Sequence, residues 1–277
     1  MTTPMWVTSD DGTEVAAYDF GGEGEPVLFA HATGFHAHLW LPIIDLLRDR
    51  FHCYALDERG HGATPTPITG DFAWERGADD IRAVVAAFGL ERPRGVGHSA
   101  GGALLVLAEE DQPGSWQSLW VFEPVIFPGP PPGLADNPLA AGARRRRAHF
   151  DSLDAAYENF AAKPPFNSFT PASLRAYVDH GFVEDPAGGV TLACRPDDEA
   201  ATYEQAVLTG AWARLDEIKI PVHAVAGADT SHLPGQVIGD IVARLPHGSL
   251  EVMDGLSHFG PFEDPPRIAA SILSAFA

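Results

Sequence analysis

The sequence predicts an α/β protein in which helices cover both faces of a twisted, mostly parallel sheet. Short apolar runs typical of strands alternate with longer segments whose apolar residues recur every three or four positions. This alternation stops after residue 123 and resumes near residue 211. The chain of 277 residues is 45% hydrophobic, which provides enough apolar material for one large core.

Strands are expected where short apolar runs stand between turn residues. In chain order these runs are Glu14–Phe20, Pro26–His31, His52–Asp57, Arg94–His98, Ser118–Glu123, Val222–Ala226 and Ser249–Met253. Helical spacing predicts helices over Leu39–Leu47, Phe72–Leu90, Ala100–Glu109, Gly235–Leu245 and Pro266–Phe276. Because strands and helices alternate, the strands are expected to run parallel, and Asp71 is expected to cap the second helix.

A different pattern occupies the middle of the chain. The cluster Pro128–Gly133 interrupts the alternation, and a mostly helical stretch runs to about Gly210. Two helices are expected there, Leu153–Lys163 and Pro171–His180, with Ser152 and Thr170 as their caps. We therefore expect a core made of residues 1–123 and 211–277, and a helical cap or lid made of residues 124–210.

Charge and composition restrict the environment and the partners. The formal charge of −20 argues against nucleic acid and anionic membranes, because both attract cationic surfaces. The one basic run, Arg144–Arg147, is interpreted as a solvated helix face. No apolar stretch is long enough to cross a bilayer, and Met1–Asp10 lacks the features of a signal peptide. A cytoplasmic protein is expected, with Cys53 as a buried thiol.

The candidate nucleophile is Ser99, in the centre of Gly97-His98-Ser99-Ala100-Gly101. A serine hydroxyl is a weak nucleophile and needs a base within hydrogen-bond reach, which an acid in turn orients. Glycines at both ends of the motif permit a sharp turn that exposes the serine. An apolar strand precedes the motif and a helix rich in alanine and leucine follows it, as this turn requires.

Together with three further motifs in the same order, this turn resembles the α/β-hydrolase family over nearly the whole chain. The further motifs are His31–Phe35, Asp57–Gly62 and Ser257–Phe259. The resemblance implies a helical cap inserted after the sixth strand, and an oxyanion hole formed by the backbone amides of Thr33 and Ala100. This chain departs from the family pattern at Ala32, where glycine is usual.

The expected general base is His258, because it follows the last predicted strand and would lie at the carboxyl edge of the sheet. His31, His61 and His98 stand within motifs that shape the backbone and are interpreted as structural, although His98 is also a candidate for the border of the pocket. The histidines have no metal-ligand spacing, so neither a metal nor a cofactor is expected.

The acid that orients the base has two candidates. Asp229 follows the strand Val222–Ala226 and gives the expected order Ser, Asp, His. Glu123 ends the strand that follows the nucleophile helix, and some members of the resembled family take their acid from this place. Asp229 is preferred, and Glu123 is the alternative.

The expected substrate is a small or medium hydrophobic ester, because the inserted segment is rich in aromatic residues. His36, His98, Phe127 and Phe166 are the candidate pocket residues. The most favoured function is that of a carboxylesterase that forms an acyl-enzyme. Lactonase, carbon–carbon bond hydrolase and perhydrolase activities on the same residues remain open, as does the choice between monomer and homodimer.

Two other classes of function fit part of the pattern. Gly95–Ala100 also matches a dinucleotide fingerprint, which would indicate an oxidoreductase, but that interpretation leaves the other motifs unexplained. A ligand-binding receptor with this fold and little turnover is the second alternative, because fold does not determine function.

Overall fold

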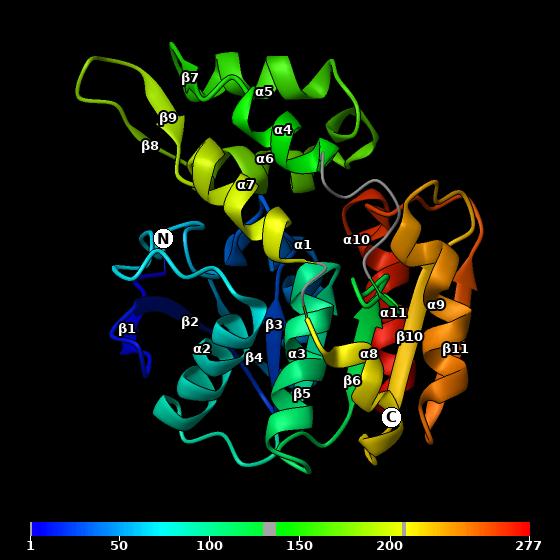
Figure 1. The fold of residues 1–277 in the computed structure, drawn as a ribbon. Coiled ribbons are helices and arrows are strands. Elements are labelled where there is room, and N and C mark those ends of the chain that lie inside the picture. The colour runs from blue at the N-terminus through cyan, green and yellow to red at the C-terminus, as the bar shows by residue number, and fades with distance from the viewer. Residues whose placement is uncertain (1, 130–136, 207–208) are drawn as a thin grey trace.

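A central sheet of eight strands forms the middle layer of the computed structural model, which describes residues 2–129, 137–206 and 209–277 (Figure 1). The strand order is β1-β2-β4-β3-β5-β6-β10-β11. Their bounds are Met5–Thr8 (β1), Glu14–Gly22 (β2), Glu25–Ala30 (β3), Phe51–Leu56 (β4), Arg94–His98 (β5), Leu119–Phe122 (β6), Val222–Gly227 (β10) and Gly248–Met253 (β11). The pairs β1–β2 and β2–β4 are antiparallel and the other five pairs are parallel, which confirms the mostly parallel sheet.

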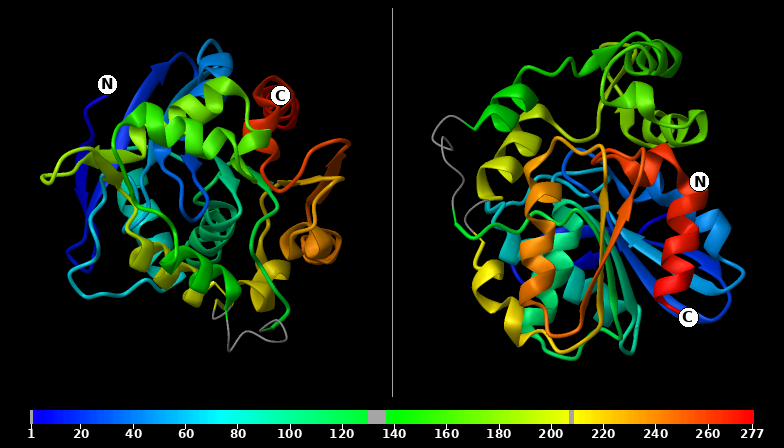
Figure 2. Two further views of the ribbon diagram at one scale, coloured as in Figure 1. Left: turned by 90° about the horizontal axis from the view of Figure 1, so that it is seen from above. Right: turned by 90° about the vertical axis from the view of Figure 1, so that its right-hand side faces the viewer.

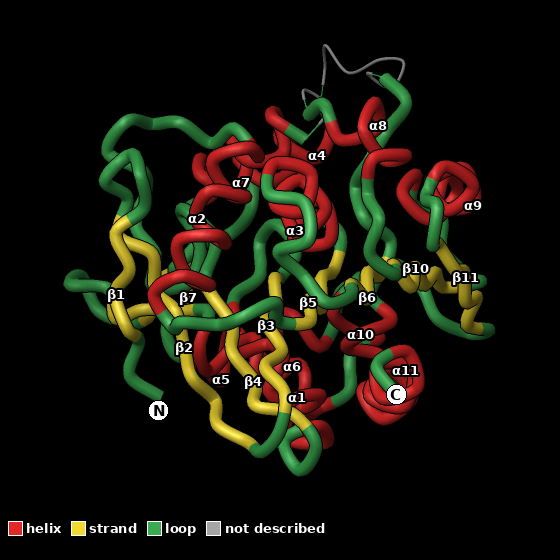
Figure 3. The backbone as a smooth tube through the Cα atoms, turned by 90° about the horizontal axis from the view of Figure 1, so that it is seen from below, coloured by secondary structure: helices red, strands yellow, loops and turns green. Residues whose placement is uncertain are grey.

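Helices cover both faces of this sheet, as predicted (Figure 3). One face packs against α1 (Leu41–Leu47) and α11 (Pro265–Ala275). The other face packs against α2 (Trp74–Ala87), α3 (Ala100–Asp111), α8 (Ala211–Arg214) and α9 (Leu233–Arg244). Each layer buries its own apolar cluster, which provides the main stabilisation of the fold. Among the described residues, no helix combines the length and the apolar character needed to span a bilayer.

Helix α2 starts later than the sequence predicts. The expected cap, Asp71, does not cap it, since the helix begins at Trp74 after Ala73. The Asp71 carboxylate instead accepts a hydrogen bond from the Ala73 amide at 2.9 Å. Asp71 therefore closes the turn before the helix, a local bond that competes with capping.

The described segment of residues 137–206, between β6 and α8, lies across the edge of the sheet at which the parallel strands end (Figures 1 and 2). Its helices are α4 (Pro138–Arg144), α5 (Leu153–Ala161), α6 (Pro171–His180) and α7 (Pro196–Gln205). The Ser152 and Thr170 side chains cap α5 and α6, as predicted. The segment also holds a small antiparallel sheet that the sequence analysis missed, formed by β7 (His149–Phe150), β9 (Val190–Leu192) and β8 (Phe182–Glu184).

Arg146 shows that the basic run is not a uniformly solvated face. Arg144 forms an exposed ion pair with Glu204 at 2.8 Å, as expected for a surface residue. The Arg146 guanidinium instead pairs with the buried Glu199 and donates to Tyr177 Oη at 2.7 Å. Glu199 also contacts the loop after β3, where a Cβ added at Gly34 would lie 2.8 Å from Glu199 Oε1. Arg146 therefore neutralises a carboxylate at the junction between the inserted segment and the core.

We expect Arg146→Met to lower the free energy of unfolding by about 3–5 kcal/mol, because it leaves the Glu199 carboxylate buried without a cation. Urea unfolding followed by circular dichroism measures the change. Arg144→Met is the matched control, since its ion pair is exposed, and we expect little effect from it. Adding Glu199→Gln to Arg146→Met should recover most of the loss. A similar loss in both single variants would contradict this interpretation of Arg146.

Candidate active site

The candidate nucleophile occupies the sharp turn between β5 and α3. Ser99 has φ 55° and ψ −111°, a backbone conformation that is strained for any residue except glycine. The flanking glycines are required by close packing. A Cβ at Gly97 would lie 2.6 Å from the Gly102 Cα atom, and a Cβ at Gly101 would lie 2.3 Å from the Ala30 carbonyl oxygen. The motif therefore folds as the tight strand-to-helix turn that the sequence predicts.

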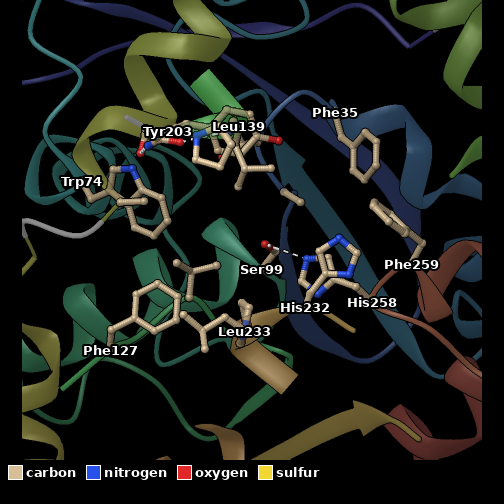
Figure 4. A pocket seen from close by; sticks show the side chains of 17 residues that line it. Phe35, Trp74, Ser99, Phe127, Leu139, Tyr203, His232, Leu233, His258 and Phe259 are labelled. Carbon is tan, nitrogen blue, oxygen red and sulfur yellow. Dashed lines mark hydrogen bonds between the residues drawn. The ribbon is translucent and has the colours of Figure 1, made fainter. Parts of the chain in front are cut away.

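The side chain of His258 lies next to that of Ser99 (Figure 4). His258 lies between β11 and the short helix α10 (Gly260–Glu263), and its side chain is nearly fully buried. His258 Nε2 lies 3.1 Å from Ser99 Oγ. The carbonyl oxygen of His258 is 2.8 Å from His98 Nε2, which fixes the backbone on one side of the ring. The structure thus brings together the two residues predicted as nucleophile and base.

The carboxylate that contacts His258 belongs to Glu123, not to Asp229. Glu123 Oε2 lies 2.6 Å from His258 Nδ1, and no part of Glu123 is exposed to solvent. An ionised carboxylate can accept hydrogen bonds but cannot donate them, so the Nδ1–H group of His258 donates to Glu123. Nε2 of His258 is then free to accept a proton from Ser99.

Two groups from the end of β10 hold this carboxylate in place. The Gly227 amide donates to Glu123 Oε1 at 3.1 Å, and the Thr230 hydroxyl donates to Glu123 Oε2 at 3.0 Å. The Asp229 side chain is exposed, while its amide donates to the Leu256 carbonyl. The preference for Asp229 is therefore wrong, since the alternative residue, Glu123, is the one that contacts His258. The loop after β10 turns its amide and hydroxyl donors toward Glu123 and its carboxylate toward solvent.

The predicted oxyanion donors lie beside the nucleophile. Thr33 and Ser99 both line the same cavity, and Ala100 begins the helix that follows Ser99. In the described part of the chain, neither the Thr33 amide nor the Ala100 amide has a hydrogen-bond acceptor. The Gly101 amide donates to the His31 carbonyl at 2.9 Å and ties the two segments together. Free amides at this position suit a developing negative charge, although their role stays a prediction.

A cavity of about 340 Å³ opens above Ser99 and His258. Most of its lining is apolar, and the polar side chains besides the nucleophile and the base are few. The lining residues are Ala32, Thr33, Phe35, Trp74, Ser99, Val125, Phe127, Asn137, Pro138, Leu139, Tyr203, Ala206, His232, Leu233, Pro234, His258 and Phe259. Both the core and the inserted segment contribute to this lining, so the segment covers the candidate site.

Of the four candidate pocket residues, only Phe127 lines the cavity. His98 is fully buried beneath it, and this burial, together with the charge of nearby His258, lowers its pKa well below the usual value. His36 is buried against α6, with Nε2 3.0 Å from the Tyr177 carbonyl. Phe166 packs against Phe160 and Tyr177, with ring centroids 4.7 and 4.6 Å away. These three expectations are wrong, because His36 and His98 are buried in the core and Phe166 packs against aromatic side chains of the inserted segment.

Tyr203 and His232 are lining residues that sequence reasoning missed. Tyr203 lies on α7, and helical spacing gives no sign of which residues face a cavity. His232 had one available signal, since it follows β10 by five residues and so belongs to the sheet edge that carries the site. Among the described residues, no group of three or more His, Cys, Asp or Glu side chains could hold a metal ion.

Comparison with known proteins gives a consistent result. A non-heme chloroperoxidase of Kitasatospora aureofaciens is 28% identical over 262 residues, which cover 91% of this chain and 90% of the relative. A bifunctional esterase/perhydrolase of Acinetobacter calcoaceticus is 24% identical over 97% of this chain and 98% of its own length. The crystal structure of E-2-(acetamidomethylene)succinate hydrolase shares the fold, with a TM-score of 0.87, 20% identity, and coverage of 100% of this chain and 99% of that one. The profile of the alpha/beta hydrolase family matches residues 27–271, and the chain therefore belongs to the alpha/beta hydrolase family.

Proposed function

We propose that this protein is a serine hydrolase that cleaves carboxylic esters through an acyl-enzyme formed on Ser99. The observation that carries the proposal is the continuous hydrogen-bonded chain from Glu123 through His258 to Ser99 at the floor of an apolar cavity. An acid, a base and a nucleophile in this order are the groups that acyl transfer requires.

In the proposed reaction, Ser99 Oγ attacks the acyl carbon while His258 Nε2 takes its proton. The carboxylate of Glu123 holds the imidazole in the correct tautomer and stabilises the imidazolium that forms. The amides of Thr33 and Ala100 bind the oxyanion. His258 then protonates the leaving alcohol, and a water molecule, activated by the same imidazole, hydrolyses the acyl-enzyme and releases the acid.

An ester is favoured over other acyl substrates by the lining of the cavity and by the relatives. Apolar side chains such as Phe127, Leu139 and Leu233 suit the hydrocarbon part of an ester. One of the similar proteins is named as an esterase/perhydrolase and another as 3-oxoadipate enol-lactonase 2 of Acinetobacter baylyi. A lactone is an internal ester, and perhydrolysis replaces water by hydrogen peroxide at the acyl-enzyme, so both follow from the same residues.

A substrate panel tests this proposal. p-Nitrophenyl and methyl esters of graded chain length, medium-ring lactones and a β-diketone are compared by kcat/KM, with hydrogen peroxide added in a separate series. We expect the simple esters to be cleaved and the β-diketone, which requires carbon–carbon bond cleavage, to be inert. Cleavage of the diketone alone would contradict the ester assignment, and turnover of no substrate would contradict the proposal as a whole.

The pH dependence of turnover follows from the role of His258. Only the neutral imidazole can accept the proton of Ser99, so we expect kcat/KM to fall about tenfold per pH unit on the acid limb. Stopped-flow or steady-state rates in a constant-ionic-strength buffer series measure the limb. A rate that stays constant to about pH 4 would exclude a histidine base.

A further inference from the structure

The candidate cavity contains no cationic side chain. All eighteen lysine and arginine residues of the chain fall within the described ranges, and none of them lines the cavity. In the inserted segment, Arg146 is engaged by Glu199 and by Tyr177 Oη. The chain as a whole carries a formal charge of −20, which disfavours the approach of anions.

An anionic group on a substrate would therefore lose its water in this cavity without gaining a cationic partner. Burying an unpaired charge in an apolar site costs far more than burying a neutral polar group. The lining consists mainly of aromatic, aliphatic and proline side chains. Such a lining disfavours a substrate that carries a carboxylate next to the scissile ester.

His232 is the polar side chain that stands out in this lining. Its imidazole stacks on that of His258, with ring centroids 4.8 Å apart and an interplanar angle of 24° (Figure 4). The loop that carries it is fixed, because the His232 amide donates to Thr230 Oγ1 at 3.3 Å and the Thr230 hydroxyl donates to Glu123. This arrangement places a second imidazole directly beside the candidate base.

The ring nitrogen of His232 that a ligand can reach is Nε2, because Nδ1 is buried. Within the described part of the chain, neither ring nitrogen has a protein hydrogen-bond partner. Burial, and next the proximity of His258, lower the pKa of His232 below its usual value, which favours the neutral ring. In a neutral imidazole, Nε2 either donates to a carbonyl or accepts from a hydroxyl, depending on the tautomer, and it supplies no positive charge to an anion.

We propose that the cavity selects an uncharged ester and that His232 is a specificity-determining residue, which binds a neutral hydroxyl or carbonyl group next to the scissile bond. The proposal rests on the proposed function, since it concerns the substrate of the same Ser99. It adds the charge class of the substrate and the residue that recognises its polar group.

The charge class is tested with dimethyl adipate and monomethyl adipate, which differ by one ionised carboxylate near neutral pH. After correction for the two equivalent ester groups of the diester, we expect kcat/KM to be at least about 100-fold higher for the diester. Equal rates, or a preference for the half-ester, would overturn the inference about charge while leaving the ester hydrolase intact. Turnover of neither compound would overturn the inference about charge, and it would overturn the proposed function as well if the p-nitrophenyl esters are also inert.

The role of His232 is tested with methyl 3-hydroxybutanoate and methyl acetoacetate, each compared with methyl pentanoate. We expect the wild type to prefer at least one of the polar esters by about tenfold in kcat/KM, which corresponds to one good hydrogen bond. In His232→Phe this preference should fall to about one, and His232→Gln, which keeps a donor and an acceptor, should restore a part of it.

The matched control is His247→Phe, because His247 is an exposed histidine outside the cavity. It should keep the preference of the wild type. A preference that survives in His232→Phe, or that is absent from the wild type, would overturn the role of His232. Thermal unfolding of each variant shows whether the fold is intact, and the ratio of two substrates on one protein sample does not depend on the fraction of active enzyme.

Discussion

Replacing Glu123 with glutamine is expected to lower kcat/KM for ester hydrolysis by about 10⁴-fold, whereas replacing Asp229 with asparagine should change it by less than about threefold. The large effect has a geometric cause. An amide in place of the carboxylate, which lies 2.6 Å from His258 Nδ1, no longer fixes the tautomer in which Nε2 accepts the serine proton. The Asp229 side chain is exposed and has no such contact.

Steady-state kinetics with a p-nitrophenyl ester compare the two variants. Because Glu123 is fully buried and accepts bonds from Gly227 and Thr230, thermal unfolding must show that Glu123→Gln still folds. An unchanged KM with a lowered kcat would place the loss in the chemical step. Near-normal turnover in Glu123→Gln together with a large loss in Asp229→Asn would reverse the assignment of the acid.

Replacing Ser99 with alanine is expected to reduce kcat by about 10⁶-fold, because among the described lining residues Ser99 carries the hydroxyl that lies within reach of His258 Nε2. Substrate binding should survive, since the cavity lining is unchanged, and isothermal titration with a slowly hydrolysed ester analogue would measure it. Ser274→Ala, at an exposed serine of α11, is the control and should retain full activity. Substantial turnover in Ser99→Ala would exclude Ser99 as the nucleophile.

The sequence predicted the parts of the site that depend on local structure. Ser99 needs only a strand, a helix and two glycines, all of which are adjacent in the chain, so the turn can be recognised without tertiary information. His258 follows the last strand, and the carboxyl end of a parallel strand fixes the edge of the sheet at which it lies. Both features follow from the alternation of strands and helices.

The sequence did not determine which carboxylate orients His258, because the loops after two neighbouring strands begin at the same edge of the sheet. β6 and β10 pair in register from Leu119↔Val222 to Phe122↔Val225, so a carboxylate after either strand lies close to the base. The choice depends on whether the loop after β10 turns Asp229 or Thr230 inward, and this is a property of the tertiary fold. No local pattern distinguishes the two.

Local sequence patterns also could not predict the cavity lining or the small sheet of the inserted segment. Tyr203 and Trp74 meet in the cavity although they are far apart in the chain, and helical spacing cannot distinguish a residue facing a cavity from one facing the core. The strands β7, β8 and β9 contain two or three residues each, which is too short for an alternating pattern to be visible. Arg146 looked like its exposed neighbours because burial depended on Glu199, more than fifty residues later.

Covalent labelling tests the central claim most directly. The wild-type protein is treated with a fluorophosphonate, and the adduct is located by intact mass and peptide mapping. One adduct per chain on the peptide that contains Ser99 is expected, formed much more slowly in Glu123→Gln and at the wild-type rate in Asp229→Asn. No adduct on the wild type, or an adduct at another residue, would contradict a serine nucleophile at Ser99 that is activated through His258 and Glu123.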